Sequence, residues 1–203
     1  MENSFYRNVL VIFDMGGVLT HHGHTFASVA HALGINESDF FRIAGKGWDR
    51  LVCGKIDSHL FWKKLSQKLK GNISPDLFNR YFYPQINQAV LEMIKRLQRT
   101  HYKVVCGTNT IADHYQIHVH RGDYDIFDQI YASHLIGLAK PDPQFYHYIL
   151  KKEKTIPGNT VFIDDMMENI QSAREIGIQA VHFTDSQSLQ EDLEKLKLFN
   201  GAS

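Results

Sequence analysis

Four runs of apolar residues along the chain have the length and composition of buried β-strands. The first, Val9–Phe13, is uninterrupted and rich in β-branched residues, and the polar residue Asp14 follows it. Strands of this type are buried on both faces and belong to parallel sheets that helices cover. Similar runs lie at 102–106, 160–163 and 178–183, and a shorter, weaker candidate lies at 130–132.

Apolar residues at helical spacing lie between and after these runs. The stripes are Ile86, Val90, Ile94 and Leu97; Phe145, Tyr148 and Ile149; Ile170, Ala173 and Ile176; and Leu189, Leu193 and Leu196. Pro143 suits the first turn of the second helix, and Gly177 is a typical stop for the third. Alternating strands and helices predict an α/β fold with a doubly wound, Rossmann-like parallel sheet.

The stretch from residue 20 to 84 has helical patterns and no convincing buried strand. Phe26, Val29, Ala30 and Leu33 form one stripe, and Phe61, Leu65 and Leu69 form another. Ser58 is a possible helix cap, and Ser74-Pro75 is expected to open a further helix. We interpret 20–84 as a small helical cap inserted after the first strand, with 1–19 and 85–203 forming the α/β core.

Composition narrows the range of partners and compartments. Lysine plus arginine (22) balance aspartate plus glutamate (22), so bulk charge suggests neither a nucleic-acid nor a membrane partner. Cys53 and Cys106 are the only cysteines, and a reduced intracellular protein is the simplest interpretation. The first residues have no basic segment followed by an apolar one, so we expect a cytoplasmic protein, monomeric or homodimeric.

Polar residues that could act in catalysis or bind a ligand follow the predicted strands. They are Asp14, Thr108-Asn109 and Asp164-Asp165, joined by Lys140 before Pro141. Ligands of doubly wound sheets bind beyond the carboxyl ends of the strands, so these residues are expected to meet at one edge. A carboxylate can act as a nucleophile, Mg²⁺ requires hard oxygen ligands, and a lysine and a hydroxyl can bind phosphate oxygens. Phosphoryl transfer needs these parts and few others.

Four segments in this order resemble the motifs of the haloacid dehalogenase-like (HAD) superfamily of aspartate-nucleophile hydrolases. The similar segments are Phe13–Thr20, Val104–Asn109, Gly137–Pro143 and Val161–Ile170. The resemblance runs from about Val9 to Phe183. It implies that residues 20–84 close over the site and select the leaving group.

The resemblance also assigns roles to individual residues. It implies that Asp14 attacks phosphorus while Thr108 and Lys140 hold the phosphoryl oxygens, and that Asn109 contacts the phosphate or the entering substrate. The expected Mg²⁺ ligands are Asp14, Asp165, the carbonyl of Gly16, and Asp164 directly or through a water. The implied function is Mg²⁺-dependent hydrolysis of a small phosphorylated metabolite through an aspartyl-phosphate.

Gly16 departs from most phosphatases of the superfamily, which carry an acid–base aspartate at this position. General acid–base help is typically worth ~10²–10⁴ in rate, so its loss need not abolish activity. A subgroup with Asp-x-Gly looks similar throughout, including sugar-1-phosphate phosphatases and relatives of the amino-terminal domain of soluble epoxide hydrolase. Sugar phosphates are the expected substrates by that analogy. A catalytically degenerate binding or regulatory domain and a haloacid dehalogenase are the alternatives.

Histidines and cap aromatics leave further alternatives. His21, His22 and His24 are candidates to replace the missing acid. The alternative is that they are part of a polar linker into the cap. His114, His118 and His120 have partial zinc-like spacing but lack completing ligands, so a surface location is favoured. The cap aromatics are expected to form its core, with one or two lining the substrate pocket; they are Trp48, Trp62, Tyr81, Phe82 and Tyr83.

Overall fold

The computed structural model describes residues 9–21 and 25–199, which contain one parallel five-stranded sheet. Its strand order is β5-β4-β1-β6-β7. The strands are β1 (Leu10–Phe13), β4 (Lys103–Thr108), β5 (Gln129–Ala132), β6 (Thr160–Asp164) and β7 (Gln179–His182). The predicted α/β parallel-sheet fold is confirmed, and the weak candidate at 130–132 is the edge strand β5.

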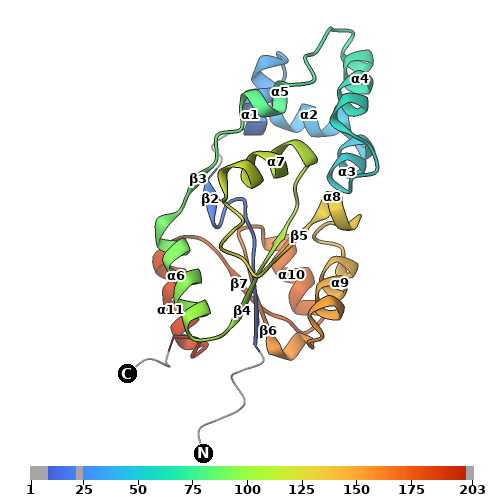
Figure 1. Ribbon diagram of the computed structural model, residues 1–203. Helices are drawn as coiled ribbons and strands as arrows, with labels where there is room; N and C mark the ends of the chain where they lie inside the picture. Colours follow the sequence, from blue (N-terminus) through green and yellow to red (C-terminus); the bar gives the residue numbers. More distant parts are fainter. Residues whose placement is uncertain (1–8, 22–24, 200–203) are drawn as a thin grey trace, which may run out of the picture.

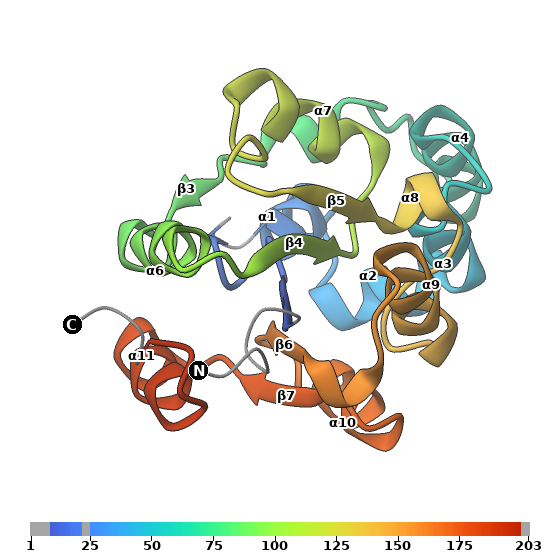
Figure 2. The ribbon, with the colours of Figure 1, turned by 60° about the horizontal axis from the view of Figure 1, so that its bottom comes forward.

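Helices cover both faces of the sheet, which explains why the central strand β1 is a continuous apolar run (Figure 2). Val11 and Phe13 of β1 pack with α6 (Gln88–Arg99) and α11 (Ser186–Lys195) on one face. Leu10 and Ile12 pack with α9 (Pro143–Glu153) and α10 (Met167–Glu175) on the other. Successive side chains of a strand point to opposite faces, so two covered faces require an apolar residue at every position.

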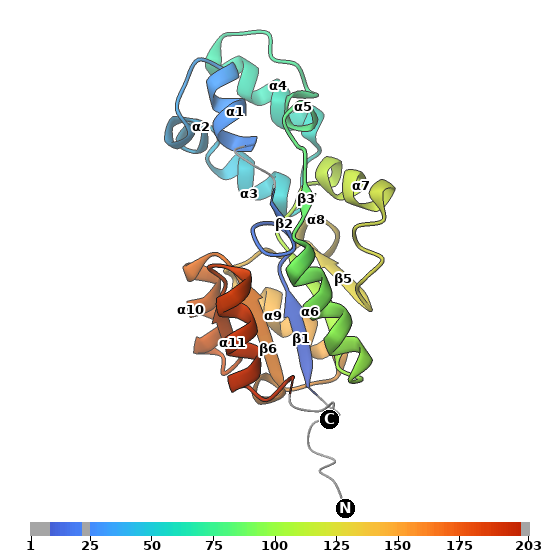
Figure 3. The same cartoon turned by 90° about the vertical axis from the view of Figure 1, so that its left-hand side faces the viewer.

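Five helices form a separate group above the sheet, beyond the carboxyl end of β1 (Figures 1 and 3). They are α1 (Thr25–Ala32), α2 (Glu37–Ala44), α3 (Lys46–Val52), α4 (Ser58–Leu69) and α5 (Leu77–Arg80). We call this group the cap. Phe40, Phe61, Trp62 and Phe78 are nearly inaccessible and form the centre of its own apolar core. The cap therefore has an apolar core distinct from the two that flank the sheet.

A short antiparallel pair connects the cap to the sheet. It consists of β2 (Thr20–His21) and β3 (Gln85–Ile86). Ile86, which the sequence places in a helical stripe, lies in β3 instead, and α6 begins at Gln88 behind the cap residue Asn87. The pair is too short for its alternation to be visible in the sequence.

Two predicted helix starts in the cap are wrong by one or two residues. Asp57, not Ser58, caps α4, because the Asp57 carboxylate accepts a hydrogen bond from the Leu60 backbone N–H at 2.7 Å. An ionised carboxylate at a helix start is favoured by the free N–H groups there. Ser74-Pro75 precedes a turn, and α5 begins only at Leu77.

The cap rests on two helices of the sheet domain, α7 (Ala112–Arg121) and α8 (Ser133–Ile136). Ser58 donates a hydrogen bond to the Asp113 carboxylate, and the Ser133 hydroxyl donates to the Val52 carbonyl at 2.8 Å. A 3₁₀ turn, η2 (Pro157–Asn159), completes the elements. Cys53 and Cys106 are free thiols. Within the described residues, no helix is long and apolar enough to cross a membrane.

Candidate active site

Three neighbouring strands bring polar side chains to one edge of the sheet. Asp14 directly follows β1, Thr108 ends β4 and Asp164 ends β6. Because β1 lies between β4 and β6 and all three are parallel, their carboxyl ends meet at the same edge. Asp14 and Thr108 are buried, and Asp164 is inaccessible.

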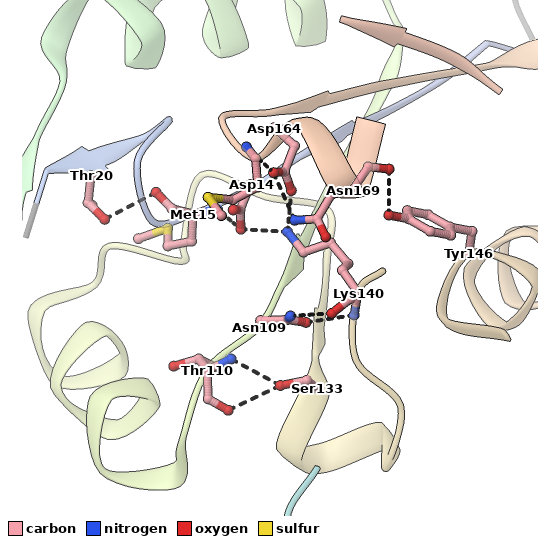
Figure 4. Close-up of polar contacts among 11 residues, drawn as sticks. Asp14, Met15, Thr20, Asn109, Thr110, Ser133, Lys140, Tyr146, Asp164 and Asn169 are labelled. Atoms are coloured by element: carbon pink, nitrogen blue, oxygen red, sulfur yellow. Dashed lines mark hydrogen bonds and ion pairs between the residues drawn. The ribbon is translucent and has the colours of Figure 1, made fainter. Parts of the chain in front are cut away.

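Lys140 lies between two of these carboxylates (Figure 4). Its Nζ is 3.0 Å from Asp14 Oδ1 and 2.6 Å from Asp164 Oδ2. The Lys140 side chain is only 1% exposed, so water screens these ion pairs weakly. Asp14 Oδ1 also accepts a hydrogen bond from the Met15 N–H at 2.7 Å. The sequence-predicted residues Asp14, Lys140 and Asp164 are therefore in direct contact.

Backbone and amide groups fix the orientation of this centre. Asn109 Nδ2 donates to the Lys140 carbonyl at 2.7 Å, and Asn109 Oδ1 accepts from the Lys140 N–H at 2.8 Å. Asp164 Oδ1 accepts from the Met166 N–H at 2.8 Å and from Asn169 Nδ2 at 2.9 Å. Both the Lys140 backbone and the Asp164 carboxylate are thus held by neighbours that do not titrate.

The electrostatic balance of the centre is negative. Burial raises the pKa of Asp14 to about 7; the Lys140 ammonium opposes this rise and the Asp164 carboxylate adds to it. Burial lowers the pKa of Lys140, but the Asp14 and Asp164 carboxylates more than offset this and raise it above its ordinary value. Burial and the Asp164 carboxylate raise the pKa of Asp165. One ammonium group therefore faces more carboxylate charge than it can neutralise.

Asp14, Asp164 and Asp165 form a cluster suited to a metal ion. One carboxylate oxygen from each lies within 4.8 Å of the others. Carboxylate oxygens are the ligands that Mg²⁺ prefers, and a cation here would offset the charge that raises the pKa of Asp14. The donor set and its charge therefore fit a divalent cation.

Gly17 allows the chain to pass close to this cluster. Its φ of +81° lies in the left-handed region, and a Cβ added at this position would lie 2.2 Å from Asp165 Oδ2. Any other residue at this position would force the Asp165 carboxylate or the loop to move. Gly17, the second glycine of the first motif, is thus required because the Asp165 carboxylate of the fourth motif lies so close to it.

A cavity of about 670 Å³ opens between this centre and the cap. Asp14, Thr108, Asn109, Lys140 and Asp165 all line it, as does Gly16. The cap contributes residues of α1, α2 and α3 to the opposite wall. Every one of the sequence-predicted site residues except the inaccessible Asp164 borders this single cavity.

Comparison with known proteins agrees with this arrangement. The family model for haloacid dehalogenase-like hydrolases matches residues 9–177. The chain belongs to this family. It is 28% identical over 190 residues to a sesquiterpene phosphatase of Aspergillus oryzae, covering 91% of this chain and 94% of that protein.

Two further matches extend the comparison to bacteria. This HAD-like hydrolase is 24% identical over 183 residues to a D-ribitol-5-phosphate phosphatase of Bacteroides thetaiotaomicron, covering 83% of this chain and 88% of that protein. A HAD family enzyme of the same organism, solved in complex with magnesium and inorganic phosphate, superposes with a TM-score of 0.67. That match has 19% identity and covers 87% of this chain and 94% of the other.

The histidines of this hydrolase lie differently from the sequence-based expectation. His114 and His118 are buried, not on the surface, whereas His120 is exposed. The His114 ring stacks on Phe82 at 3.7 Å between centroids, and Phe82 leads from the cap to β3. His21 lines the cavity, and His22 and His24 lie outside the described residues. The predicted surface location is confirmed for His120 and is wrong for His114 and His118, because α7 turns these two rings toward Phe82.

Sequence analysis missed three polar residues near the centre. Asp123 accepts a hydrogen bond from His118 Nδ1 at 2.8 Å, Tyr124 lines the cavity, and Asn169 holds Asp164. Asn169 belongs to the fourth motif segment, and its position one helical turn after Asp164-Asp165 is a usable signal. No local pattern distinguishes Asp123 or Tyr124, because their roles depend on their contacts with side chains of α7.

Proposed function

We propose that this hydrolase is a Mg²⁺-dependent phosphatase that cleaves small phosphate monoesters through an aspartyl-phosphate on Asp14. The observation that carries the proposal is the contact of Lys140 with both Asp14 and Asp164, next to Asp165, at the floor of the cavity. Hydrolysis of a phosphate ester needs a nucleophile, a cation and an oxygen-ligated metal at one point, and these residues supply the nucleophile, the cation and carboxylate ligands for the metal.

The two oxygens of Asp14 have different surroundings. Oδ1 accepts the Met15 N–H and faces Lys140, whereas no hydrogen bond from a described residue reaches Oδ2. We assign nucleophilic attack to Oδ2 for this reason. Ionisation of Asp14 is required, because only the carboxylate has the electron pair that attacks phosphorus.

Thr108 and Lys140 would hold the oxygens of the transferred group. Both are buried cavity residues, and a buried ammonium stabilises developing negative charge more strongly than an exposed one. Asn109 borders the same cavity, but its side-chain amide makes two hydrogen bonds to the Lys140 backbone. We therefore assign to Asn109 the positioning of Lys140, in addition to the predicted substrate contact.

We assign metal binding to Asp14, Asp165 and the Gly16 carbonyl. Asp164 would act on the metal site through the residues that it contacts or through a water molecule. Asp164 already accepts two hydrogen bonds on Oδ1 and contacts Lys140 through Oδ2. Mg²⁺ supplies charge neutralisation and in-line orientation of the phosphate. It would also favour the ionised form of Asp14.

The proposed reaction has two displacements at phosphorus. In the first, Asp14 forms a bond to phosphorus, the ester P–O bond breaks, and the leaving oxygen takes a proton. In the second, water attacks the aspartyl-phosphate, loses a proton, and releases inorganic phosphate and the Asp14 carboxylate. Gly16 has no side chain to carry these protons, so substrates with good leaving groups should react fastest.

The comparisons support phosphate chemistry but not a single substrate, because one relative is named for a sesquiterpene and another for D-ribitol 5-phosphate. The relatives in Aspergillus oryzae and Bacteroides thetaiotaomicron are both named as phosphatases, and the superposed enzyme holds magnesium with inorganic phosphate. These properties belong to those proteins. They favour phosphate hydrolysis over the two alternatives, a binding domain without activity and a dehalogenase.

The test is p-nitrophenyl phosphate hydrolysis by the wild type and by Asp14→Asn, each with Mg²⁺ and with EDTA. We expect turnover only in the wild type with Mg²⁺, restored when Mg²⁺ is added after EDTA. Asp192→Asn, which removes a surface carboxylate paired with Lys195, is the matched control and should retain turnover. If the wild type hydrolysed neither this nor other phosphate esters, the result would favour a binding domain without activity. Hydrolysis of a 2-haloacid in EDTA would favour the dehalogenase.

A further inference from the structure

The cap side of the cavity is lined by three aromatic rings, Phe26 of α1, Phe41 of α2 and Trp48 of α3. We call them the aromatic wall. Phe26 lies 5.2 Å from Phe41 and 5.1 Å from Trp48 between ring centroids, and Phe41 lies 5.7 Å from Trp48. The three rings therefore form one continuous patch.

The aromatic wall differs from the rest of the cap in its exposure. Phe40, Phe61 and Trp62 are nearly inaccessible, whereas all three rings of the aromatic wall are only partly buried. They already contact the cap core on one side, so their remaining surface faces the cavity. Aromatic surface left in contact with water is unfavourable, and it favours an apolar occupant.

The apolar lining continues from the aromatic wall toward the catalytic residues. Val52, Phe82 and Ile111 line the cavity and are buried. Met15, next to Asp14 in the chain, also borders it, as does the ring of Tyr124, whose buried hydroxyl has no hydrogen-bond partner among the described residues. A substrate whose phosphate contacts Lys140 would thus meet apolar surface along much of its leaving group.

Charged groups restrict the leaving group further. Among the described residues that line the cavity, Lys140 is the only lysine or arginine, and Asp14, Asp165 and Glu168 are acidic. A second phosphate or a carboxylate on the substrate would meet no further lysine or arginine among these lining residues. The lining fits one phosphate group and an uncharged remainder.

Several polar groups of the lining are already bonded within the protein. The Thr25 hydroxyl donates to the Tyr81 carbonyl at 3.1 Å, and His118 Nδ1 pairs with Asp123 at 2.8 Å. Each hydroxyl of a sugar or polyol loses water on binding and needs a partner in return. The apolar lining offers a sugar little compensation and offers a hydrocarbon chain or ring direct contact.

We propose that the preferred substrate is the phosphate monoester of an apolar alcohol, with its hydrocarbon portion against the aromatic wall. This inference rests on the proposed phosphatase function and replaces the sugar phosphates expected from sequence. The cavity volume of about 670 Å³ lies within the range of about 300–1,000 Å³ that holds drug-sized ligands.

The test compares two substrates with similar leaving groups and different polarity. n-Octyl phosphate and ribitol 5-phosphate both release a primary alcohol, so intrinsic reactivity differs little between them. Acetyl phosphate, whose leaving group is small, reports the phosphoryl transfer itself. We expect kcat/KM with Mg²⁺ to be at least about tenfold higher for octyl phosphate than for ribitol 5-phosphate.

Variants of the aromatic wall locate the cause of this preference. Trp48→Gln and Phe41→Gln should each lower the octyl-to-ribitol ratio of kcat/KM by about tenfold. The ratio is taken within one preparation, so partial loss of folded protein cancels. Tyr83→Ala is the matched control, because Tyr83 is an aromatic residue of the segment between the cap and β3 that is 72% exposed and is not part of the cavity lining. It should leave the ratio unchanged.

The outcomes separate this inference from the proposed function. If acetyl phosphate is hydrolysed but ribitol 5-phosphate is used as well as octyl phosphate, the apolar-substrate inference is wrong and the phosphatase stands. A ratio that the two wall variants leave unchanged also overturns the inference. If all three phosphates stay intact with Mg²⁺, the phosphatase function itself fails and the inference falls with it.

Discussion

The side-chain amide of Asn109 makes two hydrogen bonds with the backbone of Lys140. Asn109 Nδ2 donates to the Lys140 carbonyl oxygen, and the Lys140 N–H donates to Asn109 Oδ1. The distances are 2.7 Å and 2.8 Å. This pair connects the residue after β4 to the segment before α9 and sets where the Lys140 side chain begins. Asn109 is therefore a positioning residue for the ammonium that contacts Asp14.

We expect Asn109→Ala to lower kcat by about a hundredfold, because small displacements of a catalytic group cost on this order. The measurement is kcat and KM for p-nitrophenyl phosphate. Asn159→Ala, at an exposed position in η2, should leave both constants unchanged. A rise in KM with unchanged kcat would instead mean that Asn109 contributes only to substrate binding.

Asp165 provides a test of metal binding that does not depend on activity. We expect Mg²⁺ to raise the melting temperature of the wild type, because a ligand that binds only the native state stabilises it. Asp165→Asn should melt higher than the wild type without metal, since it removes repulsion from Asp164, and should gain less from Mg²⁺. Asp49→Asn, an exposed cap position, should gain as much as the wild type. An undiminished gain in Asp165→Asn would exclude it as a ligand.

Gly17 should tolerate no side chain. We expect Gly17→Ala to lower the free energy of unfolding by more than about 1 kcal/mol, because alanine is strained at positive φ and its Cβ would meet Asp165 Oδ2. The gain in melting temperature with Mg²⁺ should fall as well. Gly158→Ala is the matched control, since nothing lies within 4 Å of a Cβ added there. Equal unfolding curves for the two variants would contradict this account.

Burial makes His118 a source of pH-dependent stability. It lowers the pKa of His118, with Asp123 opposing the shift and Arg121 adding to it. The unfolded chain therefore binds a proton at a higher pH than the folded chain, so stability falls as pH drops below about 6.5. We expect urea unfolding of His118→Gln to show a weaker loss of stability between pH 7 and pH 5.5. His134, whose pKa burial also lowers, should account for part of the loss that remains.

The exposed neighbour His120 gives the control for this pH dependence. His120→Gln should retain the wild-type slope of stability against pH. The comparison uses slopes and not absolute stabilities, because replacing a buried ring also changes packing. If His118→Gln kept the full wild-type slope, other groups would have to carry the pH dependence.

The sheet and its site could be predicted because their signals are local. Val11 and Ile12 point to opposite faces that are both covered, so the strand is a continuous apolar run. Asp14 and Asp164 lie at strand ends, where parallel topology alone brings them together. The resemblance of four ordered segments then identifies which polar residues matter.

The features that sequence analysis missed depend on contacts between distant segments. The burial of His114 comes from Phe82, a residue of the connection between cap and sheet. The strands β2 and β3 have two residues each, too few for an alternating pattern to repeat. The cavity-facing orientation of Trp48, as opposed to the buried Trp62, likewise requires the packed cap. Periodicity indicates that such residues are apolar or amphipathic, but not what they face.

The proposal that Asp14 is the nucleophile is tested most directly by acid quenching of the wild type during turnover with Mg²⁺, followed by mass spectrometry of its peptides. The account predicts a phosphoryl group on the peptide that carries Asp14. It also predicts neither the modified peptide nor phosphate release in Asp14→Asn. Phosphate release that persists in Asp14→Asn, or a phosphoryl group found on a different residue, would contradict the central claim.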